Sequence, residues 1–177
     1  FKVERGNSII KDQAKSFYNL GKGVLKADDE MKIPEHVVVI ADGNRRWARE
    51  KGWKPWVGHK KASKYERMRK IFDVCKESGV KYFSLGGWST ENWDRPEEEQ
   101  EEIFNIFRGS VKKGIEEFEK EGIRFRHLGR KDRLAEDIIE GLETLEEKSR
   151  KNTALNFQLC MDYGGRDEII RAVNGMI

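Results

Sequence analysis

The sequence contains only two cysteines and no long run of apolar residues. Cys75 and Cys160 lack the spacing of a zinc site or a redox pair, so we expect both to be buried thiols of an intracellular protein. No stretch approaches the roughly 18 consecutive apolar residues of a membrane span. No signal-peptide pattern is present either. These absences predict a soluble, cytoplasmic protein rather than a disulfide scaffold or an integral membrane protein.

Several common catalytic and nucleotide-binding motifs are also missing. The sequence has no GxxxxGK[ST] loop and no GxGxxG turn, which removes the strongest signals for nucleotide binding. It has no HExxH zinc motif, no Gly-x-Ser-x-Gly elbow and no setting for a cysteine nucleophile. The function must therefore be sought in other residue patterns.

The composition is that of a charged but folded protein. Charged residues make up 38% of the 177 residues, and the mean hydropathy is −0.81. Nine Phe, five Trp and four Tyr, with periodic apolar spacing, nevertheless indicate one folded domain. Residues 42–70 hold eleven Lys/Arg against three Asp/Glu, whereas residues 91–121 hold five against eleven. The basic segment favours an anionic ligand, and the acidic one fits the solvated face of a long helix.

Residues 1–31 predict one amphipathic helix. Apolar residues such as Ile10, Phe17 and Leu25 recur at near-helical spacing, with lysines between them. We expect this helix to pack onto the main domain; the alternative is that it lies on a membrane surface. The chain starts without Met and stops at Ile177 within a helical pattern, so we also expect a fragment or a processed form.

Strands and helices alternate along residues 32–177. Apolar runs predict strands at 36–40, 80–85, 123–128 and 154–161. Helical spacing predicts helices from 45, over 59–78, over 96–122, around 134–145 and from 167, with a loop at 52–58. This alternation predicts an α/β domain with a parallel sheet and right-handed crossovers. The first strand lacks polar alternation, so we expect it to be covered on both faces.

Glycine and polar residues follow three of the four predicted strands. The segments are Asp42-Gly43-Asn44, Gly86 through Arg95, and Tyr163-Gly164-Gly165-Arg166. The carboxyl ends of parallel strands share one edge of the sheet, so these segments should form one site. Arginines suit phosphate oxygens, and an Asp among them suits a divalent cation bound to the same phosphates. The alternative is that Asp42 caps the next helix and the arginines lie on a solvated face.

Four blocks of sequence resemble the cis-prenyltransferases, whose best-known members are undecaprenyl diphosphate synthases. In family order they are HVVVIADGNRRWA (36–48), GHK (58–60), STENWDRP (89–96) and YGGR (163–166), the last followed by Glu168 and Ile169. The resemblance covers residues 34–177. It implies the parallel-sheet cis-prenyltransferase fold with helices on both faces, formed by residues 32–177 with the C-terminal part missing. It also implies a homodimer, contact with a membrane surface because the product is a lipid, and no nucleic-acid partner.

The resemblance assigns roles in joining an allylic isoprenoid diphosphate to isopentenyl diphosphate. Asp42 would hold Mg²⁺ and help the diphosphate to leave, and Ser89 and Asn92 would assist removal of the proton. The substrate-binding residues would be Gly43, Asn44, Arg45, Arg46, Trp47, His59, Thr90, Glu91, Trp93 and Arg95. This set is chemically reasonable, because fixed donors and a metal ion stabilise the charge that develops on a leaving diphosphate.

The chain also departs from the family pattern. The arginine-rich block and the glutamate that bind isopentenyl diphosphate in the family do not occur before Ile177, so we expect residues 1–177 to bind the allylic diphosphate without elongating it. Lys54-Pro55 replaces a common loop arginine, and Asp162 stands where Asn is common. Gly86-Gly87-Trp88 replaces a Tyr-Ala-Phe-like run. Trp88 either lines the path of the growing chain, favouring short products or an irregular coupling, or packs in the core.

Two other classes of function compete with an active enzyme. The chain could be an accessory subunit that supports a catalytic partner, but the intact Asp42 and Asn92 argue against this. It could instead be a nucleic-acid-binding module, since the basic segment contains tryptophans able to stack on bases. Binding of a short isoprenoid diphosphate rather than an oligonucleotide separates these classes.

Overall fold

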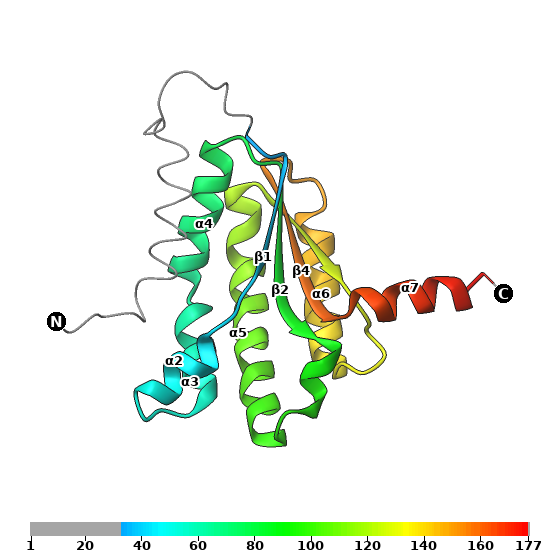
Figure 1. Ribbon diagram of the computed structural model, residues 1–177. Coiled ribbons are helices and arrows are strands. Elements are labelled where there is room, and N and C mark those ends of the chain that lie inside the picture. The colour runs from blue at the N-terminus through cyan, green and yellow to red at the C-terminus, as the bar shows by residue number, and fades with distance from the viewer. Residues whose placement is uncertain (1–32, 177) are drawn as a thin grey trace, which may run out of the picture.

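The computed structural model describes residues 33–176 and contains a four-stranded parallel sheet (Figure 1). The strand order is β1-β2-β4-β3, and each neighbouring pair is parallel. The predicted parallel α/β fold is therefore confirmed. The predicted helix at 1–31 lies outside the described residues. The strands are β1 (His36–Ile40), β2 (Tyr82–Ser89), β3 (Ile123–Leu128) and β4 (Leu155–Tyr163).

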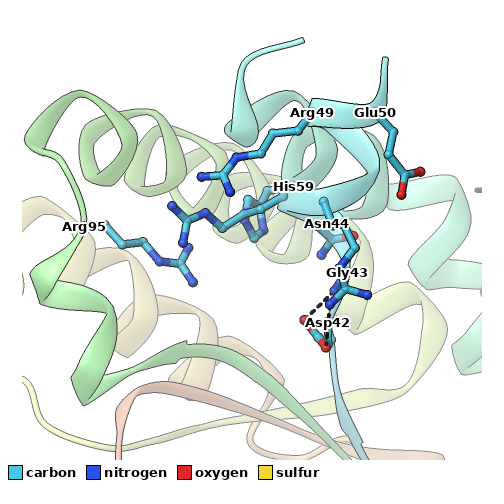
Figure 2. Close-up of a pocket in the computed structure, with 10 residues that line it drawn as sticks. Asp42, Gly43, Asn44, Arg49, Glu50, His59 and Arg95 are labelled. Carbon is cyan, nitrogen blue, oxygen red and sulfur yellow. Dashed lines mark hydrogen bonds and ion pairs between the residues drawn. The ribbon is translucent and has the colours of Figure 1, made fainter. Parts of the chain in front are cut away.

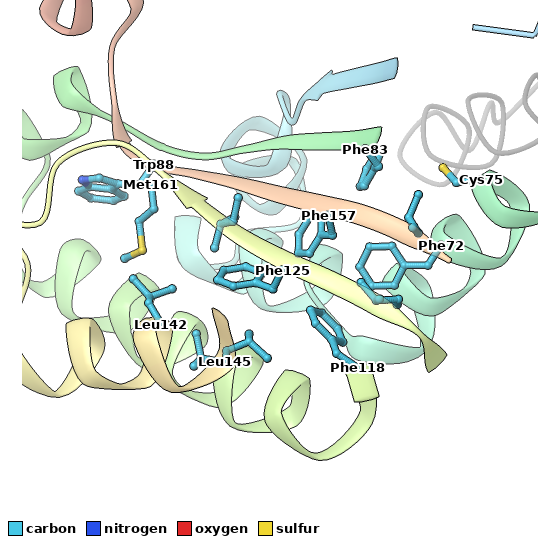
Figure 3. Packing of buried hydrophobic residues seen from close by; sticks show 14 of the residues in the cluster. Phe72, Cys75, Phe83, Trp88, Phe118, Phe125, Leu142, Leu145, Phe157 and Met161 are labelled. Carbon is cyan, nitrogen blue, oxygen red and sulfur yellow. The ribbon is translucent and has the colours of Figure 1, made fainter. Parts of the chain in front are cut away.

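Three long helices form a layer against one face of the sheet. Helices α4, α5 and α6 supply the helical residues of the core, and Figure 3 shows their side chains meeting those of the strands. Phe72 of α4 lies 4.9 Å from Phe157 of β4 and 5.7 Å from Phe118 of α5, measured between ring centroids. The helical segments are α2 (Asn44–Glu50), α3 (Pro55–Ala62), α4 (Tyr65–Glu77), the 3-10 turn η1 (Thr90–Asp94), α5 (Glu97–Glu121), α6 (Glu136–Ser149) and α7 (Gly165–Asn174).

The second face of the sheet is not covered by a helical layer within residues 33–176. Val38 is 60% exposed and Ile40 is 82% exposed, although β1 reads as a continuous apolar run. The same face carries a polar chain in which the Ser84 hydroxyl donates to Gln158 at 2.6 Å and lies 2.8 Å from His36 Nε2. The expected burial of both faces of β1 is therefore wrong for the described part of the chain.

Three predicted boundaries also need correction. The helix expected over 59–78 is two helices, because α3 ends at Ala62 and the chain turns at Ser63 and Lys64 before α4 begins. The loop expected at 52–58 ends early, because Pro55 starts α3, a position that suits proline since the first helical N–H needs no partner. Strand β2 continues through the Gly86-Gly87-Trp88 run to Ser89, with a register shift between Gly86 and Trp88. This bulge turns Trp88 toward the core.

Candidate active site

The turn after β1 forms the floor of the candidate site. Gly43 adopts φ +86°, a left-handed conformation that glycine reaches without strain, and its N–H donates to Asp42 Oδ1 at 2.6 Å. The turn leads directly into α2. Helix α3 packs closely on it, since a Cβ at Gly58 would lie 2.0 Å from the Asn44 carbonyl oxygen. Glycine at position 58 therefore lets α3 approach the turn and brings His59 to the site.

A pocket of about 340 Å³ opens beside this turn (Figure 2). Arg95 reaches it from the segment after β2, and His59 reaches it from α3. The lining is rich in cationic and N–H donor groups, so the pocket suits an anion. The lining residues are Ala41, Asp42, Gly43, Asn44, Arg45, Arg46, Arg49, Glu50, His59 and Arg95.

A buried carboxylate organises two of the arginines. Glu99 lies on the first turn of α5 and is only 3% exposed. Its Oε1 lies 3.0 Å from Arg45 Nε, and its Oε2 accepts a hydrogen bond from Arg45 Nη2 at 3.2 Å. Arg95 Nη1 lies 3.4 Å from the same Oε1. Burial lowers the pKa of Arg95 from its ordinary value, an effect that the Glu99 charge opposes. Glu99 thus holds two like charges side by side at the pocket wall.

His59 is neutral at pH 7 in this site. Burial and the charges of Arg95 and Arg45 lower its pKa to about 4. Its Nε2 is buried and has no hydrogen-bond partner among the described residues. An anion in the pocket would supply a hydrogen-bond partner for His59 Nε2 and a negative charge beside Arg45 and Arg95.

Asp42 is one of two carboxylates in the pocket lining, and it could hold a metal ion. Its side chain is 86% exposed, and Arg46 Nη2 lies 3.9 Å from its Oδ2. Within residues 33–176 no cluster of three or more His, Cys, Asp or Glu side chains could form a complete metal cage. Mg²⁺ commonly binds one or two carboxylates and completes its shell with water and substrate phosphates. Asp42 therefore fits a Mg²⁺ ion shared with a bound diphosphate.

The expected Ser89–Arg95 segment is divided between the pocket and the core. Ser89 N–H donates to Asn92 Oδ1 at 3.1 Å, and Ser89 Oγ accepts from Glu91 N–H at 3.2 Å, so both predicted proton-transfer residues cap the turn η1. The Trp93 indole donates to Asp162 instead of facing the pocket. Of this segment, Arg95 alone lines the pocket.

The remaining predicted residues have other surroundings. Trp47 packs edge-on against Trp53 at 5.5 Å between ring centroids, under the Lys51 ammonium group. Thr90 packs against Gly164, since a Cβ added at Gly164 would lie 2.5 Å from Thr90 Oγ1. Trp88 is buried at 1% exposure, with the Arg95 guanidinium 5.3 Å from its ring centre. The structure places Trp88 in the core, behind Arg95.

Sequence reasoning missed three contributors to this site. Arg49 and Glu50 line the pocket one and a half turns along α2, and their helical spacing from Arg45 and Arg46 would have indicated this. Glu99 lies four residues after Arg95, a spacing that favours an ion pair, but the run of acidic residues around it concealed which one is buried.

The comparison with protein families decides the classification. The family described as "Putative undecaprenyl diphosphate synthase" matches residues 40–177. The chain belongs to the undecaprenyl diphosphate synthase family. The isoprenyl transferase of Aquifex pyrophilus is 42% identical over 143 residues, which are 81% of this chain and 61% of the relative. The chain thus spans about three fifths of the length of this relative. The resemblance to cis-prenyltransferases is confirmed.

Two solved structures share the fold. A probable undecaprenyl diphosphate synthase from Campylobacter jejuni has a TM-score of 0.68 and 34% identity, covering 81% of this chain and 62% of that one. Lavandulyl diphosphate synthase from Lavandula x intermedia, solved in complex with dimethylallyl diphosphate, has a TM-score of 0.75 and 27% identity, covering 81% and 61%. Between residues 33 and 176, no helix is both long and apolar enough to cross a membrane.

Proposed function

We propose that this protein is a Mg²⁺-dependent prenyltransferase that condenses an allylic isoprenoid diphosphate with isopentenyl diphosphate to give a cis-prenyl diphosphate. The observation that carries the proposal is the pocket after β1, where Arg45, Arg46 and Arg95 surround a space beside the exposed Asp42. Family membership supplies the reaction class. The charge of the pocket matches the diphosphate head of the substrate.

The chemistry requires charge stabilisation more than proton transfer by the protein. The bond between the allylic carbon and the diphosphate oxygen breaks, and its electron pair leaves with the diphosphate. The isopentenyl double bond then attacks that carbon, and a proton is lost from the new chain. The arginine N–H groups stabilise the growing negative charge on the leaving oxygens. Mg²⁺ held by Asp42 would supply further positive charge at the same oxygens.

The roles of Ser89 and Asn92 in the proton step remain part of the proposal. Their oxygens already accept hydrogen bonds from backbone N–H groups of the turn. The Asn92 amide N–H groups and the Ser89 hydroxyl proton stay available for a diphosphate, since both groups can donate while they accept. The turn thereby holds both side chains in fixed orientations at the carboxyl end of β2.

We also propose that the protein is a cytoplasmic homodimer that contacts the membrane surface and takes no nucleic-acid partner. The membrane contact is supported by Trp53, which is 43% exposed, with Lys51 at 6.0 Å and Lys61 at 5.8 Å from its ring centre. Tryptophan and lysine together favour the interface of an anionic bilayer.

An irregular coupling is the second candidate function, in which the acceptor is not isopentenyl diphosphate. It is supported by the structural similarity to lavandulyl diphosphate synthase, which was solved in complex with dimethylallyl diphosphate and has a TM-score of 0.75 and 27% identity. Incubation of the protein with dimethylallyl diphosphate alone, followed by mass analysis of products, tests it. A coupled ten-carbon diphosphate would support irregular coupling, and product formed only with added isopentenyl diphosphate would support the main proposal.

Calorimetric titration with dimethylallyl diphosphate, with and without Mg²⁺, tests the binding step. We expect Mg²⁺-dependent binding that weakens at least about tenfold in Arg46→Gln, because a charged donor to a phosphate contributes roughly 1.5–3 kcal/mol. Arg150→Gln is the matched control, since Arg150 lies at the end of α6 and, among residues 33–176, forms its one ion pair with Glu147 at 3.4 Å. A random oligonucleotide that bound with a steep salt dependence, while the diphosphate did not bind, would refute the proposal.

A further inference from the structure

Asp162 is an extra residue in β4 and is completely buried. Trp88 pairs with Met161 and Ser89 pairs with Tyr163, so Asp162 has no partner on β2. Its φ is +53°, in the left-handed region that residues other than glycine rarely adopt, and its exposed fraction is 0%. Bulges of this kind commonly redirect a side chain beside an active site. Here the bulge directs a carboxylate to the turn that follows β2.

Both oxygens of this carboxylate have donors. The Trp93 indole Nε1 donates to Oδ1 at 2.8 Å, and Arg133 Nε donates to Oδ2 at 2.9 Å while its Nη2 donates to Oδ1. The Arg133 guanidinium carbon also lies 5.3 Å from the Trp93 ring centre. A buried carboxylate without partners is strongly unfavourable, so the three groups depend on one another. They form a closed triangle of two hydrogen-bonded pairs and one cation–π contact.

Trp93 connects this triangle to the anion pocket. Its ring packs edge-on against Trp88, with 5.7 Å between the ring centroids, and at a tilt against Phe104, with 5.4 Å between the ring centroids. The Gln100 amide donates to the Trp93 carbonyl at 2.9 Å and to the Arg95 carbonyl at 2.7 Å. Because the turn is short and tied at both residues, a shift of the Trp93 indole moves the backbone that carries Arg95. Misplacement of a binding group by about 1 Å is enough to cost large factors in function.

The segment after β3 is hydrogen-bonded to the backbone of Asp162. Arg130 N–H donates to the Asp162 carbonyl oxygen at 3.0 Å. Gly129 adopts φ +133°, and a Cβ there would lie 2.2 Å from the Met161 carbonyl oxygen. Asp162 therefore joins the segments that follow β2 and β3 to the end of β4, and Arg133 is presented by the second of them.

We propose that Asp162 is a positioning residue for the diphosphate site: it fixes the Trp93 indole and thereby places Arg95 against the anion. The identity of that anion rests on the proposed function. The role needs the carboxylate itself, because Arg133 donates to both of its oxygens. In an asparagine at this position, the amide NH₂ group would face one of these Arg133 donors and could not accept from it. The exposed Asp132 neighbours the same segment and pairs with Arg130 at 2.6 Å, which makes it a charge-matched control.

The test measures binding of inorganic pyrophosphate with Mg²⁺ by calorimetry, in the 177-residue chain and in an Arg95→Gln background. We expect Asp162→Asn to weaken binding about tenfold in the otherwise unchanged chain, and less than about twofold when Arg95 is already replaced, because both changes act through one group. Asp132→Asn should change binding less than about twofold in either background. The indole ¹H–¹⁵N signal of Trp93 should shift in Asp162→Asn and stay in place in Asp132→Asn.

Unchanged affinity of Asp162→Asn, or an equal loss in both backgrounds, would overturn the positioning role and leave the proposed function standing. Absence of pyrophosphate binding by the unmodified chain would overturn both. If Asp162→Asn does not fold, Trp93→Phe replaces it, because this variant removes the indole donor to Asp162 and keeps an aromatic ring between Trp88 and Phe104. The same two outcomes then decide the proposal.

Discussion

Glu99 and Arg45 form an ion pair at the wall of the pocket although 54 positions separate them, with Oε1 and Nε 3.0 Å apart. Arg95 approaches the same carboxylate oxygen to 3.4 Å. The pair therefore joins the helix after β1 to the start of α5. Its geometry explains how two arginines can face one anion site before any anion is bound, because the buried carboxylate offsets their mutual repulsion.

Glu99→Gln should destabilise the protein by about 1–3 kcal/mol, because it leaves two guanidinium groups beside an uncharged, buried amide. Urea unfolding followed by circular dichroism measures this. Glu98→Gln is the matched control, since Glu98 is 67% exposed and lies 3.6 Å from Lys54. It should change the free energy of unfolding by less than about 0.5 kcal/mol. Equal effects of the two substitutions would contradict the role given to Glu99.

In a protein that also carries the arginine-rich block of the family, Asp42→Ala should abolish turnover and leave the fold intact. The side chain is 86% exposed, so the melting temperature should change by less than about 2 °C. Mg²⁺ should no longer strengthen diphosphate binding, which calorimetry with and without the metal measures. A folded variant that kept more than about a tenth of the parent rate at saturating Mg²⁺ would remove Asp42 from the mechanism.

His59 should make stability depend on pH in acid. Its pKa is about 4 in the folded protein against about 6.5 when unfolded, so the unfolded chain binds the extra proton between these values. The free energy of unfolding should therefore fall as pH drops from about 6.5 to 4, by at most about 1.4 kcal/mol per pH unit, and His59 should add no slope above that range. His59→Gln should lose this part of the slope. Parallel stability profiles of the two proteins would disprove the assignment.

Trp88→Ala should destabilise the protein by about 3–5 kcal/mol, because the side chain is 1% exposed and packs between Trp93 and Phe104. Thermal unfolding measures this. Trp53→Ala is the control, because the Trp53 side chain is 43% exposed. In a protein that also carries the arginine-rich block of the family, product length should not change, since the structure places the indole in the core. Longer products from a variant of undiminished stability would instead show that Trp88 lines the path of the growing chain.

Membrane contact through the surface around Trp53 predicts that the triple variant Lys51→Ala, Trp53→Ala and Lys61→Ala binds anionic vesicles more weakly. Each lysine near an anionic bilayer contributes about 1 kcal/mol, so the loss should exceed tenfold in a sedimentation assay. Lys112→Ala with Lys148→Ala is the control, because these lysines lie on α5 and α6. Binding that depends equally on both sets would show nonspecific charge attraction.

Local sequence was sufficient to predict the strand, turn and helix around Asp42, because an apolar run, a glycine able to adopt φ +86° and a helix-forming segment act over a few neighbouring residues. The alternation of strands and helices likewise predicted the parallel sheet. The convergence of Asp42, Arg45 and Arg95 on one pocket follows from this topology, since the carboxyl ends of parallel strands share one edge, whereas the packing of α3 brings His59 there.

Only the tertiary structure decided which side chains are buried there. Glu99 was one acid among several in α5, and packing against Arg45 selected it. Two register shifts between β2 and β4 turned Trp88 into the core and joined Asp162 to Trp93, 69 positions away. The exposure of Val38 could not be predicted from the sequence either, because an apolar run indicates a strand but not which layers cover its two faces. Such outcomes depend on contacts between distant segments, and no local pattern in the chain specifies them.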